Sequence, residues 1–362
     1  MEPEALVVTY WFDSGDDGEP YDAIVRLTGR RVGTRGTPRA GDSFTKDETI
    51  EGVVPGTGPV SITVWVYGLQ HGEWTVDGQL VRASPGAQSA NPRPGAPRAI
   101  QPATWSWRHW ALSTAPASPI KTRWALLAPL ARQPAVIPGI YTALAVVGFV
   151  VALGLQAAIL SRQGVPFDRP LAASLLALVA GLLGAKAWYT VLHPDESLIK
   201  GGWAVDGFLV VAPLVAAFTL FAWDQPIGAV LDATAPGIFF AVAIGRVGCF
   251  VTGCCAGRCT ASRWGIWSSD RRVGARRIPT QPLESAAGLV LGVVSLLVVV
   301  NGGLPVAGGV FVAAFAIYAV VRQALLRVRS ERRRVYRTLP VTAAAAGLVA
   351  VVVATLSLVQ GA

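Results

Sequence analysis

Residues 227–252 read IGAVLDATAPGIFFAVAIGRVGCFVT, a run that is long and apolar enough to cross a membrane as one helix. A spanning helix needs about 20 apolar residues. Two charged side chains, Asp232 and Arg246, interrupt the run. A charge inside a membrane is costly, so each is by default a candidate functional residue unless it lies near a helix end and reaches the headgroups. That alternative suits Asp232 better than Arg246, which lies well inside the apolar part.

Six further runs of this kind flank the first one. Candidate membrane helices therefore cover 136–160, 171–192, 203–223, 227–252, 283–300, 304–326 and 339–359. The charged residues inside these runs include Lys186, Asp206 and Glu284. Apolar residues make up 52% of the 362 residues and charged residues only 15%, with a mean hydropathy of +0.47. A wholly soluble enzyme is excluded, and we expect a mainly α, polytopic membrane domain with about seven helices.

The N-terminal part has a different composition. Residues 1–100 hold 13 of the 22 acidic residues. Runs rich in Val, Thr, Tyr and Trp, separated by Gly, Asp and Pro, predict strands at 5–12, 21–27, 60–68 and 73–82. We therefore expect three parts: a small all-β, sandwich-like domain at 1–82, a Pro-rich linker and Trp/Arg interfacial segment at 83–125, and the membrane domain at 136–359.

The net charge of +9 comes almost entirely from arginine. Guanidinium groups bind phosphate through two parallel hydrogen bonds. In a membrane protein, this surplus favours anionic membrane lipid as a partner over nucleic acid.

Several short motifs resemble those of the prolipoprotein diacylglyceryl transferase family. The main motif is GRVGCFVTGCCAGR at 245–258, and RIPTQPLE follows at 277–284. Upstream, the family's spacing is kept by GAKAWY at 184–189, KGG at 200–202, LD at 231–232 and APG at 235–237. Four positions depart from it: Lys200 stands for a histidine, Cys249 and Thr252 for asparagines, and Cys254 for a glutamate.

The resemblance implies a concrete reaction. Such enzymes move the diacylglyceryl group of phosphatidylglycerol to the lipobox cysteine thiol in the signal peptide of a prolipoprotein, so that a thioether forms and glycerol phosphate leaves; no cofactor or metal is implied. The catalytic residues that it implies are Arg246, Arg277 and Lys200, where the arginines hold the phosphate and the lysine acts as base or holds phosphate. The substrate-binding residues that it implies are Tyr141, Lys186, Gly201, Gly202, Asp232, Gly248, Gly257, Arg258, Gln281 and Glu284. The alternative is a non-catalytic, lipid-binding descendant whose β-domain recruits a partner.

All four cysteines lie within eleven residues: Cys249, Cys254, Cys255 and Cys259. Three interpretations remain open, namely a zinc site, a disulfide in an oxidising space, and small packing residues.

Two arguments on membrane orientation conflict. Arginines concentrate in the loop after residue 252 and the region after residue 321, on the side of the N-terminus, which the positive-inside rule would place in the cytoplasm. The resemblance implies the opposite, because that family's reaction faces away from the cytoplasm and its arginines meet anionic lipid. We expect a multi-pass protein of the plasma (inner) membrane with an extracytoplasmic N-terminal domain and loop 256–280.

Overall fold

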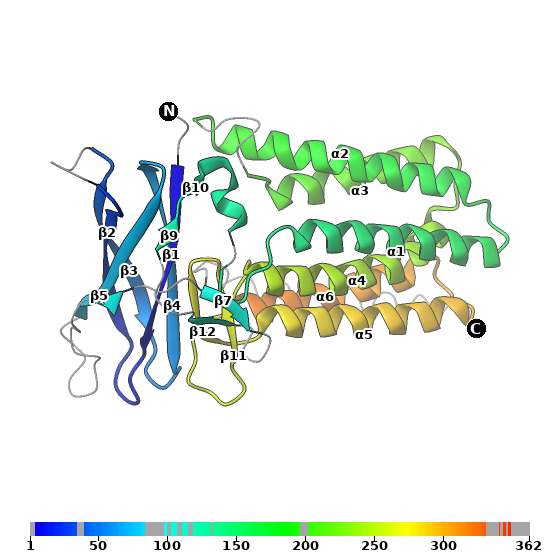
Figure 1. The fold of residues 1–362 in the computed structure, drawn as a ribbon. Helices are drawn as coiled ribbons and strands as arrows, with labels where there is room; N and C mark the ends of the chain where they lie inside the picture. Colours follow the sequence, from blue (N-terminus) through cyan, green and yellow to red (C-terminus); the bar gives the residue numbers. More distant parts are fainter. Residues whose placement is uncertain are drawn as a thin grey trace. The chain divides into compact units, whose positions relative to one another are not determined.

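The fold combines a β-rich N-terminal region with a bundle of apolar helices (Figure 1). A computed structural model provides the structure. The residues that it describes are 4–34, 40–83, 98–99, 103–106, 111–114, 119–131, 133–195, 202–330, 340, 343–344 and 347–348. The chain divides into two compact units: residues 1–144, 246–283 and 325–334 form the first, and residues 145–245, 284–324 and 335–362 form the second.

Two antiparallel sheets build the β-rich part of the first unit. One has the order β10-β1-β4-β12-β11 and the other β3-β2-β5-β6, with β9 paired to β5. A separate hairpin joins β7 and β8. The strands are β1 (Glu4–Asp13), β2 (Tyr21–Arg31), β3 (Ser43–Val53), β4 (Pro59–Leu69), β5 (Glu73–Ala83), β6 (Arg98–Ala99), β7 (Ala103–Ser106), β8 (Ala111–Thr114), β9 (Ile120–Lys121), β10 (Arg123–Trp124), β11 (Ile266–Ser269) and β12 (Val273–Arg277).

Alternating apolar side chains from both sheets share one core, as a half-buried strand pattern requires. Leu6 and Ile62 come from one sheet, Val25 and Leu27 from the other, and Trp74 is fully buried among them. The four predicted strands and the β-rich region are confirmed.

Strand β3 was missed because its sequence is polar. It lies at an edge of its sheet and presents Lys46, Asp47 and Glu48 in succession. Charged edge strands of this kind prevent pairing with other chains, and they lack the apolar alternation that predicts a strand. Most of the predicted linker at 83–125 lies outside the described residues, and its described parts contribute β6 to β10.

Six α-helices follow in the described part of the chain, after a short 3-10 helix η1 (Ala125–Leu130). Five of them are long and apolar enough to cross a membrane, and the apolar part of α3 is shorter. Six predicted spans are therefore confirmed as helices, and the seventh, 339–359, lies almost entirely outside the described residues. The helices are α1 (Ile140–Arg162), α2 (Asp168–Leu192), α3 (Val205–Ala222), α4 (Ile227–Thr252), α5 (Thr280–Val300) and α6 (Gly309–Leu326).

Small residues let the helices of the second unit approach closely. A Cβ at Gly207 of α3 would lie 2.4 Å from the carbonyl oxygen of Gly184 in α2. A Cβ at Gly237 of α4 would lie 2.6 Å from the carbonyl oxygen of Ala152 in α1. Large apolar side chains such as Leu183 remain exposed on the outside. Helix packing by small residues with apolar outer surfaces is typical of membrane proteins.

Candidate functional site

The end of α4 and the loop after it carry most of the family-like motif. Arg246 lies in the last two turns of α4 and is half-buried, and its Nη1 donates a hydrogen bond to Cys249 Sγ at 3.7 Å. Helix α4 then ends at Thr252, and Gly253 adopts a left-handed conformation with a φ of 70°. A Cβ there would lie 2.8 Å from the backbone nitrogen of Arg271. This turn therefore requires glycine.

Gly248 sets the distance between α4 and the start of α1. A Cβ at this position would already lie 3.3 Å from the Cα and Cδ2 atoms of Tyr141. Tyr141 itself is exposed on its other side. The structure thus brings together these two predicted site residues.

The first turn of α5 holds the loop by its backbone carbonyls. Gln281 is 1% exposed, and its Nε2 donates to the carbonyl of Cys254 at 2.9 Å. Thr280 Oγ1 donates to the carbonyl of Cys255 at 3.1 Å and also to Gln281 Oε1 at 3.3 Å. The predicted site residue Gln281 therefore acts directly on the loop's shape.

Arg277 is 3% exposed and is engaged inside the loop. Its Nη2 bonds to Asp270 Oδ2 at 2.7 Å and to the carbonyl of Val273 at 3.1 Å. Its Nη1 donates to the carbonyl of Gly257 at 3.1 Å. Gly257 is packed so tightly that a Cβ would lie 2.1 Å from the carbonyl oxygen of Ile278. Arg277 and Gly257 are thus brought together as parts of the loop's framework.

Arg258 joins the loop to the chain after α6. Its Nη2 donates to the carbonyl of Arg327, and its backbone nitrogen donates to the carbonyl of Val328 at 2.9 Å. A bridge between Gly257 and Arg329 continues this contact. Arg329 thereby lies beside the loop, a placement that the sequence offered no means of finding.

Three of the four cysteines form one cluster. The Sγ atoms of Cys249, Cys254 and Cys255 all lie within 4.8 Å of one another. Hydrogen bonds with the Cys249 and Cys254 thiols lower the pKa of the Cys255 thiol, and the guanidinium groups of Arg329 and Arg246 act in the same direction.

Cys259 lies apart from this cluster. Its backbone forms an isolated antiparallel β-bridge with that of Arg277, and its side chain packs against the core of the β-rich region, where burial raises the pKa of the thiol. The four cysteines that are adjacent in sequence therefore divide into a group of three and a single packing residue.

The second unit holds other predicted site residues. Lys186 Nζ of α2 donates a hydrogen bond to the carbonyl of Gly202 at 3.4 Å and lies 5.3 Å from the Trp203 ring centroid. A Cβ at Gly202 would meet the Tyr189 ring at 2.8 Å. Two of the predicted site residues, Lys200 and Gly201, lie outside the described residues.

Asp232 of α4 caps helix α6. Its Oδ2 accepts the backbone N–H of Gly308 at 2.8 Å and its Oδ1 accepts that of Phe311 at 3.0 Å. A carboxylate at a helix N-terminus satisfies unpaired donors and complements the helix dipole. The position of Asp232 thus orders two helices of this unit.

Glu284 of α5 is fully buried and pairs with two side chains of α6. Its Oε1 accepts a hydrogen bond from Tyr318 Oη at 2.8 Å and lies 2.7 Å from Arg322 Nη1. The sequence analysis missed both partners. Their spacing of four residues, which puts them on one helix face, is the signal that could have found them.

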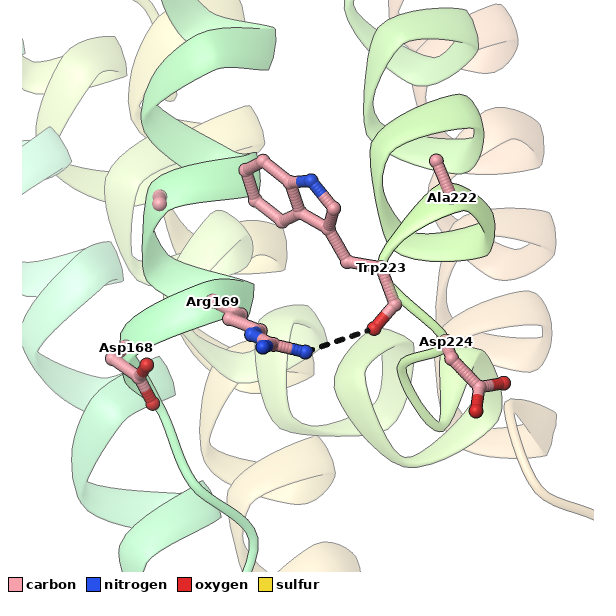
Figure 2. A pocket seen from close by; sticks show the side chains of 6 residues that line it. Asp168, Arg169, Ala222, Trp223 and Asp224 are labelled. Atoms are coloured by element: carbon pink, nitrogen blue, oxygen red, sulfur yellow. Dashed lines mark hydrogen bonds between the residues drawn. The ribbon is translucent and has the colours of Figure 1, made fainter.

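An open pocket lies at the opposite end of α2 from Lys186. It is lined by residues at the start of α2 and the end of α3, including Asp168, Arg169, Trp223 and Asp224. Figure 2 shows Arg169 reaching the carbonyl of Trp223 at 3.4 Å. None of the predicted site residues lines it.

Comparison with known proteins assigns these motifs to one family. Residues 136–360 match the family described as Prolipoprotein diacylglyceryl transferase. The chain is 30% identical over 164 residues to Phosphatidylglycerol--prolipoprotein diacylglyceryl transferase 2 of Clostridium perfringens, covering 40% of this chain and 64% of that protein. It is 30% identical over 176 residues to a Phosphatidylglycerol--prolipoprotein diacylglyceryl transferase of Dehalococcoides mccartyi, covering 46% of this chain and 67% of that protein.

Proposed function

Because the chain belongs to the prolipoprotein diacylglyceryl transferase family, we propose that it transfers a diacylglyceryl group from phosphatidylglycerol to the lipobox cysteine thiol of a prolipoprotein. A sulfur–carbon bond forms, the bond from that carbon to the phosphate oxygen breaks, and glycerol phosphate leaves with the electron pair. The proton of the attacking thiol passes to a base.

The observation that carries this proposal is the placement of Arg246. Its guanidinium lies in a membrane-capable helix, beside the end of α4 where the family-like loop begins. A leaving phosphate gains negative charge as its bond breaks, and a preorganised cation stabilises that charge. Arg246 is therefore the phosphate-binding residue of the proposal.

Arg277 supports this role from inside the loop. Its hydrogen bonds to Asp270 and Gly257 hold the chain that follows α4 in one conformation. Gln281 and Thr280 fix the carbonyls of the neighbouring cysteines in the same way. Groups that are held in position before the reaction lose little entropy when the transition state forms.

Lys186 is a second candidate for contact with the lipid headgroup. Its ammonium lies beside Trp203, and a lysine next to tryptophan suits the headgroup layer. Lys200, two residues before Gly202, is proposed as the base or as a further phosphate contact.

We also propose that the β-rich region and the loop after α4 face away from the cytoplasm. Strand β12 of that loop pairs with β4, which supports placing both on the same side of the membrane. An even number of crossings must then separate them, and we propose that α1, α2, α3 and α4 supply four, with α3 crossing in spite of its shorter apolar part. The plasma membrane is the compartment where phosphatidylglycerol and exported prolipoproteins would meet this face.

The experiment uses the full chain in nanodiscs that contain phosphatidylglycerol with labelled acyl chains. A lipobox peptide with its cysteine should gain the mass of a diacylglyceryl group, and the same peptide with serine should not. The Arg246→Ala variant should transfer the diacylglyceryl group about 10²–10³ times more slowly, as expected for the loss of one contact to the charge that develops on the leaving phosphate. Arg263→Ala, at an exposed arginine of the same loop, is the matched control.

Two outcomes would contradict the proposal. Turnover by Arg246→Ala at the rate of the control would remove Arg246 from the site. If the unmodified chain binds phosphatidylglycerol but forms no thioether, it is a lipid-binding protein. The departures from the family's histidine at Lys200 and from its asparagine at Cys249 would then explain the missing transfer activity.

A further inference from the structure

The cluster of Cys249, Cys254 and Cys255 has the composition and spacing of a metal site. Zinc binds thiolate sulfur at about 2.3 Å, which puts tetrahedral sulfur ligands about 3.8 Å apart. The three Sγ atoms already lie within 4.8 Å of one another. Small side-chain rotations would therefore close them around one ion.

The backbone is folded to bring these sulfurs together. Cys249 lies on the last turn of α4, and the backbone nitrogen of Cys254 donates to its carbonyl at 3.0 Å. Cys255 has a φ of 58°, a left-handed conformation that is strained for any residue other than glycine. The hydrogen bonds from Thr280 and Gln281 to the carbonyls of Cys255 and Cys254 hold this conformation. Packing alone gives no reason for a strained turn that converges three thiols.

Polar groups around the cluster suit thiolate ligands. Arg246 Nη1 donates to Cys249 Sγ at 3.7 Å, whereas Thr252 Oγ1, which lies 3.9 Å from Cys254 Sγ, donates its proton to the carbonyl of Gly248 at 2.6 Å. Hydrogen bonds to the coordinating atoms orient metal ligands, and positive charge offsets the negative charge of three thiolates with one divalent ion. Cys259 is partly buried elsewhere, against the core of the β-rich region, so three sulfurs form the set.

We propose that Cys249, Cys254 and Cys255 bind a zinc ion and leave its fourth position open to the sulfur of an external thiol. Zinc sites with three protein ligands and one open position are typically catalytic, whereas structural sites are closed by four. Cys254 and Cys255 are partly exposed, which gives a fourth ligand a way to approach.

The identity of that thiol rests on the proposed function. The acceptor cysteine of the prolipoprotein would occupy the open position and lose its proton to the base of the proposed reaction, because a coordinating thiol is deprotonated. Its sulfur then attacks the glyceryl carbon, and glycerol phosphate leaves with the electron pair of the broken carbon–oxygen bond. The zinc ion keeps its oxidation state, and the thioether product, a weaker ligand, departs.

The first test measures metal binding without reference to activity. The untagged full chain in nanodiscs is supplied with zinc, desalted and analysed by mass spectrometry of metals. About one zinc ion per chain is expected in the unmodified protein and in the control Cys259→Ser, and less than about a tenth of that in Cys254→Ser and Cys255→Ser. Two variants at partly exposed positions guard against a loss caused by misfolding.

A thiol count in denaturant separates the alternatives. The site is supported if four thiols react in denaturant and three of them are unreactive in the folded, zinc-loaded chain. Two reactive thiols would show a disulfide and overturn the proposal. Four thiols with no zinc, or equal zinc in Cys254→Ser, would also overturn it.

The second test uses cobalt in place of zinc. A lipobox peptide with cysteine should shift the visible spectrum of the cobalt-loaded chain, and the serine peptide should not, because a fourth sulfur changes the coordination. Metal binding without diacylglyceryl transfer would leave the site standing and remove the proposed function. Normal transfer by zinc-free Cys254→Ser would overturn the proposal that the zinc ion holds the acceptor thiol and would leave the proposed function standing.

Discussion

Gly274 of β12 lies opposite Ser61 of β4, so the loop after α4 adds two strands to a sheet of the N-terminal region. A Cβ at position 274 would lie 2.5 Å from Ser61 Oγ and 2.6 Å from the Trp267 ring. Only glycine fits here without displacement of its neighbours. The β-rich region therefore supports the same loop that carries Asp270 and Arg277.

Gly274→Val should detach this loop from the sheet. The added side chain overpacks a closed position, for which about 1–3 kcal/mol of stability is expected to be lost. Limited proteolysis within residues 256–280 should accelerate, while that of the helices should not. Gly154→Ala, where a Cβ would meet nothing within 4 Å, is the control. Equal cleavage of the two variants would contradict a supporting role for the sheet.

Asp232→Ala should loosen the start of α6. The substitution leaves the backbone N–H groups of Gly308 and Phe311 without their acceptor, at a cost of roughly 1–3 kcal/mol. Asp232→Asn keeps one acceptor oxygen and should fall between. Faster hydrogen exchange at 308–312 is the measurement. Asp224→Asn, at an exposed turn residue, should change nothing there. Unchanged exchange in Asp232→Ala would refute the capping role.

Arg322→Ala should destabilise the second unit more than Glu284→Gln does. Removal of the arginine takes the positive charge of an ion pair away from the fully buried Glu284 carboxylate, which keeps its hydrogen bond from Tyr318, and breaking a buried ion pair from this side costs about 3–5 kcal/mol. Removal of the carboxylate charge leaves an arginine that is 33% exposed near the end of α6 and can extend toward the headgroups. Thermal unfolding of both variants and of the double variant tests this order. A reversed order would contradict it.

Tyr21 should make the β-rich region sensitive to alkaline pH. Burial raises the pKa of Tyr21 to about 12, and the Asp13 carboxylate acts in the same direction. An unfolded tyrosine titrates near pH 10. The stabilisation is therefore complete below about pH 10 and is lost as the pH rises toward 12, because the unfolded chain releases the proton first.

Tyr21→Phe should remove that alkaline loss of stability. It also removes the hydrogen bond from Tyr21 Oη to the carbonyl of Ser14 at 3.0 Å, which costs about 1 kcal/mol at neutral pH. Urea unfolding followed by tryptophan fluorescence between pH 8 and pH 12 is the measurement. Tyr67→Phe, at an exposed tyrosine, should keep the alkaline loss. The same loss in Tyr21→Phe would exclude Tyr21 as its source.

Single cysteines should report the proposed orientation. In a chain without the native cysteines, Thr34→Cys and Ser262→Cys are exposed positions of the first unit, and Asn301→Cys lies in the turn between α5 and α6. An impermeant thiol reagent applied to intact cells should label the first two and not the third. Labelling of Asn301→Cys alone would show that the chain has the opposite orientation in the membrane.

The sequence by itself determined the membrane helices and the family. Apolar runs of about 20 residues leave few structures open, because every backbone polar group in a bilayer must be bonded within the segment. The spacing of Arg246, Arg277 and Glu284 along the chain carried the resemblance. Local patterns of this kind are visible without any knowledge of contacts.

Only the tertiary structure decided which of these residues meet. Strands β11 and β12 are short, and β12 ends in two arginines; β12 becomes a strand because β4 offers a partner about 200 residues earlier in the chain, and β11 then pairs with β12. Arg277 finds Asp270, Asp232 finds the start of α6, and three of four neighbouring cysteines converge while Cys259 joins the β core. Sequence spacing could not separate these outcomes, because the direction of a side chain after a left-handed turn is fixed by the surrounding hydrogen bonds and packing.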